Sequence, residues 1–252
     1  MDARGIEGVV FDVDDTVTRE GVVEREAFEA LWKLRDAGLV AIACTGRPLG
    51  WSDAIAGTWP VSAAVGENGA GWALRRGHVI DVGSFDPPEL AARRRATLEA
   101  ILDDVRARMP EVRLAHDQPA RRADLAFDVA ETASLSREQI AQLGAILEAH
   151  GARMLVSTVH AHAIVGEWDK AEGAVRAAEA LGIARERARE RLVFVGDSGN
   201  DAAAFAFFAH TVGVANVAPH VPKLPRAPRW ITPSDRGRGF AELAAHLLEG
   251  RG

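Results

Sequence analysis

The sequence contains little of what identifies several large classes of protein. Only one of its 252 residues is a cysteine, Cys44, which excludes an internal disulfide framework. Cys44 ends an apolar run, residues 40–44, where cysteine behaves as a small apolar side chain. No apolar stretch approaches the roughly 18 residues that cross a bilayer, and residues 1–5 show no charged-then-apolar secretion signal. We therefore expect a cytoplasmic protein that does not bind a membrane.

An excess of positive charge is also missing. The chain has 30 basic and 36 acidic residues, a net charge of −6, whereas proteins that bind nucleic acid usually carry a basic patch. We therefore expect no nucleic-acid partner, although local cations and backbone N–H groups can still bind a small phosphate. Hydrophobic residues make up 48% of the chain, which is typical of a globular protein. The length suits one large α/β domain or a core with a smaller insert.

The N-terminal segment has the pattern of a parallel α/β unit. The apolar runs 8–11 and 39–44 predict two buried strands, and residues 24–37 between them carry apolar side chains at helical spacing. Gly38 is expected to end that helix, and Pro48 is expected in the first turn of the next one. Two strands joined by a helix predict a parallel sheet.

The pattern changes from about Ser84 to about Val165. Helices are predicted at 87–109 and 136–150, and strands at 112–115, 123–129, 153–156 and 160–165. Helix followed by paired strands, occurring twice, predicts an α+β insert. The α/β pattern then returns, with helices predicted at 170–181, 201–208 and 240–248, strands at 192–195 and 211–214, and a proline-rich loop at 218–229.

Two aspartates, Asp12 and Asp14, follow the first predicted strand directly. Ligand sites in parallel sheets gather beyond the carboxyl ends of the strands, and residues two apart on an extended chain point the same way. Two carboxylates at close range cannot both stay ionised cheaply without a cation, so one can be a nucleophile or metal ligand while the other moves a proton. The same pattern is also typical of a solvated acidic loop.

Three further segments place polar groups at strand ends or helix starts. Thr45 and the glycine after it offer a hydroxyl and backbone N–H groups for an anion, although a helix N-cap is the alternative for Thr45. Lys170 supplies a cation at a helix start, unless it is simply solvated. Residues 196–201 form a second acidic loop after a strand, and hard oxygen ligands suit Mg²⁺.

In this order, the four segments resemble the motifs of the haloacid dehalogenase-like hydrolase superfamily. The residues DVDDT at 12–16 resemble its first motif, Thr45 its second, Lys170 its third and GDSGND at 196–201 its fourth. The size and place of the insert resemble the C2-type cap of subfamily IIB, the Cof-type and sucrose-phosphatase-like phosphatases. Asn68 lies in an NGA element similar to the one that this branch carries before the cap.

The resemblance implies a fold and a domain organisation. We expect an α/β, Rossmann-like parallel-sheet core made of residues 1–83 and 166–252. An α+β cap of the C2 type, residues 84–165, is expected to be inserted into it.

The resemblance also implies roles for single residues. Asp12 would attack phosphorus and form an aspartyl-phosphate, and Asp14 would act as general acid and base. Mg²⁺ would be the cofactor, and its expected ligands and supporting groups are Asp12, the backbone carbonyl of Asp14, Asp197 and, through water, Asp201. The phosphate-binding and substrate-binding residues implied for the core are Thr45, Gly46, Arg47, Asn68, Lys170 and Asn200. Asp15 is the one departure, since relatives commonly have glycine there, and we expect no loss of activity from it.

Residues of the insert are the candidates for substrate choice. His160 and His162 alternate along a predicted strand and so share one face, where they bind substrate or merely cover a polar surface. Arg121, with Arg122 beside it, is a candidate clamp for a second anionic group, although exposed arginine pairs are common; His116 is a further candidate.

These features predict a phosphatase acting on a small phosphomonoester, with a sugar phosphate as the expected substrate. A phosphomutase of the same superfamily is the alternative, and a non-catalytic protein that binds a phosphate ligand is a third. We expect a monomer or a homodimer.

Overall fold

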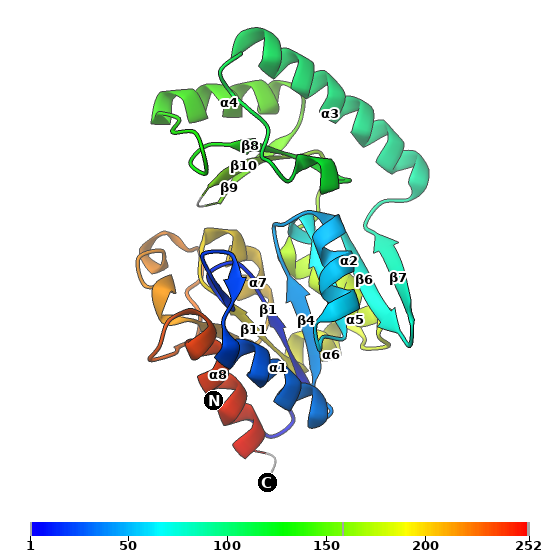
Figure 1. Ribbon diagram of the computed structural model, residues 1–252, viewed down its shortest axis with the longest axis vertical. Helices are drawn as coiled ribbons and strands as arrows, with labels where there is room; N and C mark the ends of the chain where they lie inside the picture. Colours follow the sequence, from blue (N-terminus) through cyan, green and yellow to red (C-terminus); the bar gives the residue numbers. More distant parts are fainter. Residues whose placement is uncertain (1, 158, 251–252) are drawn as a thin grey trace.

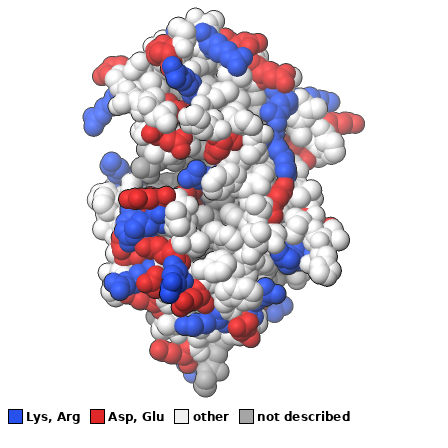
Figure 2. Space-filling model, viewed as in Figure 1, with Lys and Arg blue, Asp and Glu red and all other residues white. Residues whose placement is uncertain are grey.

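The computed structural model describes residues 2–157 and 159–250, arranged as two stacked parts (Figure 1). Acidic and basic side chains are interspersed over the face of the molecule that Figure 2 shows. The larger part is built on an eight-stranded sheet whose strands are β1 (Gly8–Phe11), β4 (Val40–Cys44), β5 (Ala63–Gly66), β6 (Gly71–Arg76), β7 (Val79–Ser84), β11 (Leu192–Gly196), β12 (His210–Gly213) and β13 (Trp230–Ile231). Their order in space is β13-β12-β11-β1-β4-β5-β6-β7. The pairs from β13 to β5 are parallel, whereas β6 and β7 are antiparallel additions at one edge. The expected parallel-sheet α/β core is therefore confirmed.

Helices cover both faces of this sheet: α1 (Arg25–Asp36), α2 (Leu49–Thr58) and α8 (Arg236–Glu249) on one, and α5 (Lys170–Ala180), α6 (Arg185–Arg191) and α7 (Ala202–Phe207) on the other. Successive side chains of a strand point to opposite faces. Val9 and Phe11 of β1 accordingly pack with α1 and α8, while Val10 packs with α5 and α7. Burial on both faces explains why these strands are continuous apolar runs in the sequence.

The carboxyl ends of the central strands β11, β1, β4 and β5 face the second part of the molecule (Figure 1). Beside them lies a short hairpin, β2 (Thr18–Arg19) and β3 (Val22–Val23), which follows β1 closely in the chain.

The second part, called the insert below, lies between β7 and α5 in the chain. It contains the helices α3 (Pro88–Arg108) and α4 (Arg137–Ala149) and the strands β8 (Asp124–Asp128), β9 (Arg153–Val156) and β10 (His160–Ile164), in an antiparallel sheet of order β8-β10-β9. The two helices pack on the sheet face that lies away from the core, against side chains such as Phe127 and Ala161 (Figure 1). Because side chains alternate along a strand, His160 and His162 lie on the other face, toward the core.

Two details differ from the sequence-based expectation. Residues 112–115 form a single bridge, Leu114 to Phe127, and not a strand, because the chain turns into a short 3₁₀ helix at Gln118–Ala120. The hairpin, the strands β5, β6, β7 and β13 and the helix α6 were not predicted, and β7 extends to Ser84, one residue beyond the expected boundary. None of the helices in the described part of the chain is long and apolar enough to span a membrane.

Candidate active site

Asp12 lies immediately beyond the end of β1. Its backbone N–H donates to Val195 O at 2.9 Å, which continues the β1–β11 ladder by one residue. The side chain is buried, and its Oδ1 lies 2.5 Å from the Lys170 ammonium. Burial raises the pKa of Asp12 well above its usual value, and the Lys170 charge acts in the opposite direction. The carboxylate is thus desolvated but paired with one cation.

Lys170 is held at the first turn of α5, where the helix dipole disfavours a cation. It donates to Asp12 and, at 2.7 Å, to Asp201. Burial lowers the pKa of Lys170, but the charges of Asp12 and Asp201 outweigh burial and raise it above the usual value. The start of α5 is fixed by Asp169, whose side chain accepts a hydrogen bond from Glu172 N at 2.9 Å. The backbone of Asp169 packs tightly against Gly69: a Cβ added at Gly69 would lie 2.1 Å from Asp169 O. Lys170 therefore enters the site as a fixed, charged group.

The loop after β11 adds two more carboxylates. Asp201 Oδ2 accepts the backbone N–H groups of Asp197 and Ser198, at 2.9 and 3.1 Å. Burial, followed by the Asp201 charge, raises the pKa of Asp197 to about 7. Its Oδ1 is buried and has no hydrogen-bond partner among the described residues.

These carboxylates form a cluster that suits a hard divalent cation. One oxygen each of Asp12, Asp197 and Asp201 lies within 4.8 Å of the others. Lys170 is the one cation bonded to this group within residues 2–157 and 159–250, which leaves an excess of negative charge. The unpartnered Asp197 oxygen and the charge excess fit Mg²⁺, which binds through carboxylate oxygens and water.

Asp14 faces away from this cluster and toward the loop after β4. Its Oδ1 accepts from Arg47 Nε at 3.0 Å and from Nη2 at 2.9 Å, and its Oδ2 lies 3.4 Å from the Thr45 hydroxyl. The Thr45 oxygen also accepts Arg47 N at 3.0 Å. The N-cap of α2 is Pro48, without a side-chain cap, so the helix-cap alternative for Thr45 is wrong.

Asn68 lies beside this loop with an unusual environment. Its backbone is left-handed (φ 55°), and the nitrogen and oxygen of its side-chain amide are both buried without a hydrogen-bond partner in the described part of the chain. A Cβ added at Gly46 would lie 3.1 Å from Asn68 Oδ1, so the amide packs against the Gly46 backbone. An unpaired buried amide costs about 1–3 kcal/mol, and a bound phosphate or water would remove that cost.

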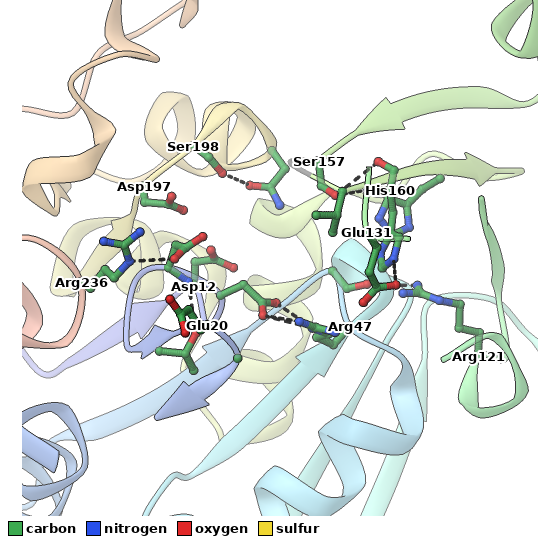
Figure 3. A pocket seen from close by; sticks show the side chains of 18 residues that line it. Asp12, Glu20, Arg47, Arg121, Glu131, Ser157, His160, Asp197, Ser198 and Arg236 are labelled. Carbon is green, nitrogen blue, oxygen red and sulfur yellow. Dashed lines mark hydrogen bonds and ion pairs between the residues drawn. The ribbon is translucent and has the colours of Figure 1, made fainter. Parts of the chain in front are cut away.

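A cavity of about 450 Å³ separates these groups from the insert (Figure 3). Asp12, Asp14, Gly46, Arg47, Asp197 and Asn200 line it from the core. His160 and His162 line it from the insert. His160 Nε2 lies 2.9 Å from Glu131 Oε2, and His162 Nδ1 lies 2.9 Å from Asp124 Oδ2. Asn200 Oδ1 accepts the Ser198 hydroxyl at 2.9 Å. Most of the expected site residues thus line one cavity. Four others, Thr45, Asn68, Lys170 and Asp201, lie behind that lining, in contact with Asp14, Gly46, Asp12 and Asp197.

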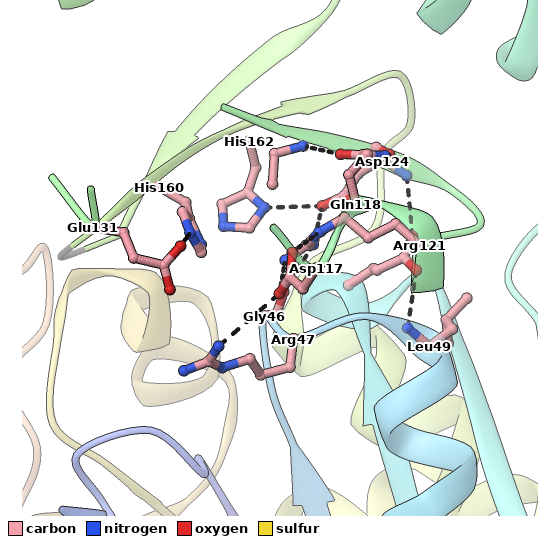
Figure 4. Close-up of polar contacts among 12 residues, drawn as sticks. Gly46, Arg47, Leu49, Asp117, Gln118, Arg121, Asp124, Glu131, His160 and His162 are labelled. Atoms are coloured by element: carbon pink, nitrogen blue, oxygen red, sulfur yellow. Dashed lines mark hydrogen bonds and ion pairs between the residues drawn. The ribbon is translucent and has the colours of Figure 1, made fainter. Parts of the chain in front are cut away.

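Arg121 lines the cavity, but its guanidinium is already bonded (Figure 4). It binds Asp117 through Nε at 3.0 Å and Nη2 at 3.1 Å. Its Nη1 binds Asp124 at 3.0 Å and Gly46 O at 3.1 Å. These contacts give Arg121 a structural role between insert and core, which differs both from the candidate anion clamp and from the alternative of an exposed arginine. Arg122 is paired with Asp53, and His116 is exposed; neither contributes to this cavity.

Several residues of the site were not predicted, among them Glu131 and Ser157 of the insert, which line the cavity, and the core residues Asn216 and Arg236. Asn216 donates to Asp15 O at 2.9 Å and to Asp197 Oδ2 at 3.2 Å. Arg236 donates to Asp15 Oδ1 at 2.7 Å and lines the cavity. Asn216 could have been found, because it follows the buried strand β12, as the other site residues follow theirs. Arg236 lies at the start of the last helix, and no sequence signal connects it with Asp15.

A scan against models of known protein families finds no match. Solved structures nevertheless share the fold over nearly the whole chain. A protein from Thermoplasma acidophilum aligns with a TM-score of 0.78 and 18% identity, over 96% of this chain and 98% of its own. The sucrose-phosphatase of Synechocystis, solved with sucrose and phosphate, aligns with a TM-score of 0.70 and 16% identity, over 96% of this chain and 98% of its own. A sugar phosphatase of subclass IIB of the haloacid dehalogenase superfamily aligns with a TM-score of 0.62 and 16% identity, over 96% of this chain and 99% of its own. The chain therefore has the fold of the haloacid dehalogenase superfamily phosphatases, as its four motifs indicated.

Proposed function

We propose that this chain is a magnesium-dependent phosphatase that hydrolyses a small phosphomonoester through an aspartyl-phosphate on Asp12. The observation that carries this proposal is the placement of Asp12. It is a buried carboxylate at a strand end, 2.5 Å from a buried lysine, beside a carboxylate cluster and open to a cavity of about 450 Å³. Phosphoryl transfer needs this combination of an aligned nucleophile and nearby cations.

In the first step, a carboxylate oxygen of Asp12 forms a bond to phosphorus and the ester oxygen leaves. Lys170 lowers the pKa of Asp12 in opposition to burial, which has the larger effect and raises it. With the Thr45 hydroxyl and the Asn68 amide, Lys170 offers hydrogen bonds to the phosphoryl oxygens. The leaving oxygen takes a proton from Asp14, which must itself take up that proton from solvent after it leaves Arg47. In the second step, Asp14 removes a proton from a water molecule, which attacks phosphorus and releases phosphate from Asp12.

Asp14 must turn to do this work. Its carboxylate is bound by Arg47 and lies beside Thr45, and 40% of its side chain is accessible. We infer that substrate entering next to Arg47 competes for the guanidinium and releases Asp14 toward the leaving oxygen.

Asp12, Asp197 and the carbonyl of Asp14 would hold Mg²⁺, with Asp201 in support. The bound ion would neutralise charge on the transferred phosphoryl group and keep the carboxylates ionised. Asp201 fixes the loop through its two backbone N–H bonds, so Asp197 stays directed at the cluster.

We propose that residues 84–165 act as a cap on a core made of residues 1–83 and 166–252. Its His160 and His162 face the cavity opposite Asp12 and Arg47, where they can bind the leaving group while the closed cavity limits access of water. A sugar phosphate is the substrate class that we favour, because two proteins of the same fold are a sucrose-phosphatase and a sugar phosphatase.

The test is phosphate release from a panel of sugar phosphates and other phosphomonoesters, with Mg²⁺ or with EDTA. We expect release that requires Mg²⁺ and is lost in Asp12→Asn, because the neutral amide cannot attack phosphorus. Asp103→Asn is the matched control, since Asp103 lies exposed on α3, and it should keep full activity. Release that survives EDTA or Asp12→Asn would contradict the proposal. Transfer of phosphate only after addition of a sugar bisphosphate would show a mutase instead.

A further inference from the structure

The insert is fastened to the core by one buried carboxylate, that of Glu67. Glu67 follows β5 and is fully buried. Its Oε1 accepts Leu49 N at 2.9 Å, at the start of α2 in the core, and Arg122 N at 2.8 Å in the insert. Its Oε2 accepts Ala123 N at 2.6 Å and Asp124 N at 3.0 Å. One side chain therefore binds four backbone N–H groups, three of which belong to the insert.

The contacts continue from Glu67 to Asp124 and, through Asp124, to His162 and Arg121, which Figure 4 labels. Asp124, whose N–H is bound by Glu67, accepts through its side chain from His162 Nδ1 at 2.9 Å and from Arg121 Nη1 at 3.0 Å. The same Arg121 nitrogen donates to Gly46 O, in the phosphate-side loop, at 3.1 Å. The position of the His162 ring over the cavity is thus set by a short series of buried bonds that starts at Glu67.

On the side of the β2–β3 hairpin, the described residues form no such bonds between the insert and the core. The β2–β3 hairpin lines the cavity with Glu20 and Gly21, facing Glu131 and Ser157 of the insert (Figure 3). Within residues 2–157 and 159–250, no hydrogen bond or ion pair joins the hairpin to the insert; Arg19 of the hairpin binds core carboxylates instead. The insert is therefore held on the side of β4, β5 and α2 and unattached on the side of the hairpin.

We propose that Glu67 is the positioning residue about which the insert pivots, and that it sets the binding of the leaving group by holding Asp124 and His162 over the cavity. This inference rests on the proposed phosphatase function. It assigns Glu67 no part in the chemistry at phosphorus, since its carboxylate oxygens are bonded to backbone and not to groups of the cavity. The substrate would enter on the hairpin side, where the insert can rock away from the core.

A carboxylate of this length is the side chain that fits the position. Glutamine would place an NH₂ group against two of the four N–H donors, and aspartate is one methylene too short to reach residues 122–124. The backbone of Glu67 has φ 47°, in the left-handed region that is unfavourable for a residue with a Cβ. Burial raises the pKa of Glu67 to about 7. The charge of Asp124 also raises this pKa, whereas the hydrogen bonds from the backbone amides lower it. The experiments are therefore placed at pH 8, where the carboxylate is ionised.

The kinetic test compares Glu67→Gln with Asp53→Asn at pH 8. Asp53 pairs with Arg122 at the same joint, but in a solvent-exposed ion pair of the kind that contributes little. We expect Glu67→Gln to raise KM for the best sugar phosphate at least tenfold, with KM for acetyl phosphate and inhibition by inorganic phosphate unchanged, because these small ligands do not reach the insert. Asp53→Asn should behave as the unmodified chain. An unchanged KM for the sugar phosphate in Glu67→Gln, or an equal rise in all three constants, would overturn the proposal.

A second measurement does not depend on catalysis. Hydrogen exchange at the amides of residues 122–124 should be slow in the unmodified chain and at least tenfold faster in Glu67→Gln, but not in Asp53→Asn. Rapid exchange of these amides in the unmodified chain would overturn the proposal, even if no ester is hydrolysed and the proposed function has failed. If Glu67→Gln does not fold, Asp124→Asn replaces it in the kinetic test, because it keeps the backbone bonds to Glu67 but weakens the contact to His162. A KM for the sugar phosphate unchanged in Asp124→Asn would then refute the proposed connection.

Discussion

Lys170→Met removes the cation that lies 2.5 Å from Asp12 and 2.7 Å from Asp201. Both carboxylates are buried, at 3% and 0% exposure, and would be left without that partner. Breaking a buried ion pair by removing one member costs about 3–5 kcal/mol. Because 1 kcal/mol shifts Tm by about 2–4 °C in a chain of this size, we expect Tm to fall by about 6–20 °C. Asp12 would also take up a proton, so phosphate release should be lost.

Asp12→Asn should stop phosphate release without this loss of stability. It removes one of three carboxylates that lie within 4.8 Å of one another, and Lys170 keeps its bond to Asp201. The cost of burying the Asp12 charge, which is the main cause of its raised pKa, disappears with the charge. We expect the free energy of unfolding to stay within about 1 kcal/mol of the unmodified value or to increase, since removing a costly buried charge can stabilise.

The assay is urea unfolding in EDTA, which keeps divalent metal out of the comparison, together with phosphate release in Mg²⁺. Lys33→Met is the control for loss of a lysine, because Lys33 is exposed on α1, and it should change neither quantity. Equal destabilisation by Lys170→Met and Asp12→Asn would refute the reasoning, because it would mean that the pair stabilises the fold only as a unit. Stability of Lys170→Met equal to that of the control would show that the carboxylates do not need this cation.

Two further predictions concern the metal and the loop after Asp14. The pKa of Asp197 is raised to about 7, so its contribution to stability is present below its unfolded pKa and is lost as pH rises through about 7. Since Mg²⁺ binds the ionised form, the difference in Tm between Mg²⁺ and EDTA should grow from pH 5.5 to pH 8, and a constant difference would contradict the metal site. Asp15 has φ 55° and pairs with Arg236 in a partly exposed ion pair. Asp15→Gly should therefore relieve backbone strain while losing an ion pair worth about 0.2–1 kcal/mol. We expect a Tm within about 3 °C of the unmodified value and full activity. Asp15→Ala keeps the strain and should be less stable than Asp15→Gly in thermal unfolding.

The core of the site could be predicted because its signals are local. Asp12, Thr45 and Asp197 each follow an apolar run of four or five residues, and the carboxyl ends of neighbouring parallel strands must meet at one edge of the sheet. Three separate stretches of sequence were thus enough to predict one cluster. The strand order β11-β1-β4 brings them together without any further information.

The antiparallel edge and the hairpin were missed for the opposite reason. The strand β7 is largely exposed, and β2 and β3 have two residues each, so neither shows the continuous apolar run that indicates a buried strand. Ion pairs between residues that are far apart in the sequence could not be predicted either. Arg236 is bonded to Asp15 across 221 positions of the chain, and such a pairing exists only once the last helix has packed beside the first strand.

Arg121 shows how the same limit affects a functional prediction. An arginine in a segment expected to cover the cavity is reasonably predicted to bind an anion, because its charge is the only property that the sequence displays. What decides its role is that Asp117 and Asp124 lie three or four residues away and take up its donors. Glu67 is the opposite case. It directly precedes the NGA element found in the sequence, yet its proposed positioning role depends on three backbone amides that lie 55 to 57 residues further along the chain. Candidates for substrate binding in the insert can therefore be chosen only after the bonds that hold the insert in place are known. Those bonds occupy the guanidinium of Arg121, whereas His160 and His162 each make one side-chain bond through a single ring nitrogen and line the cavity, which is why the proposal places them, and not Arg121, at the leaving group.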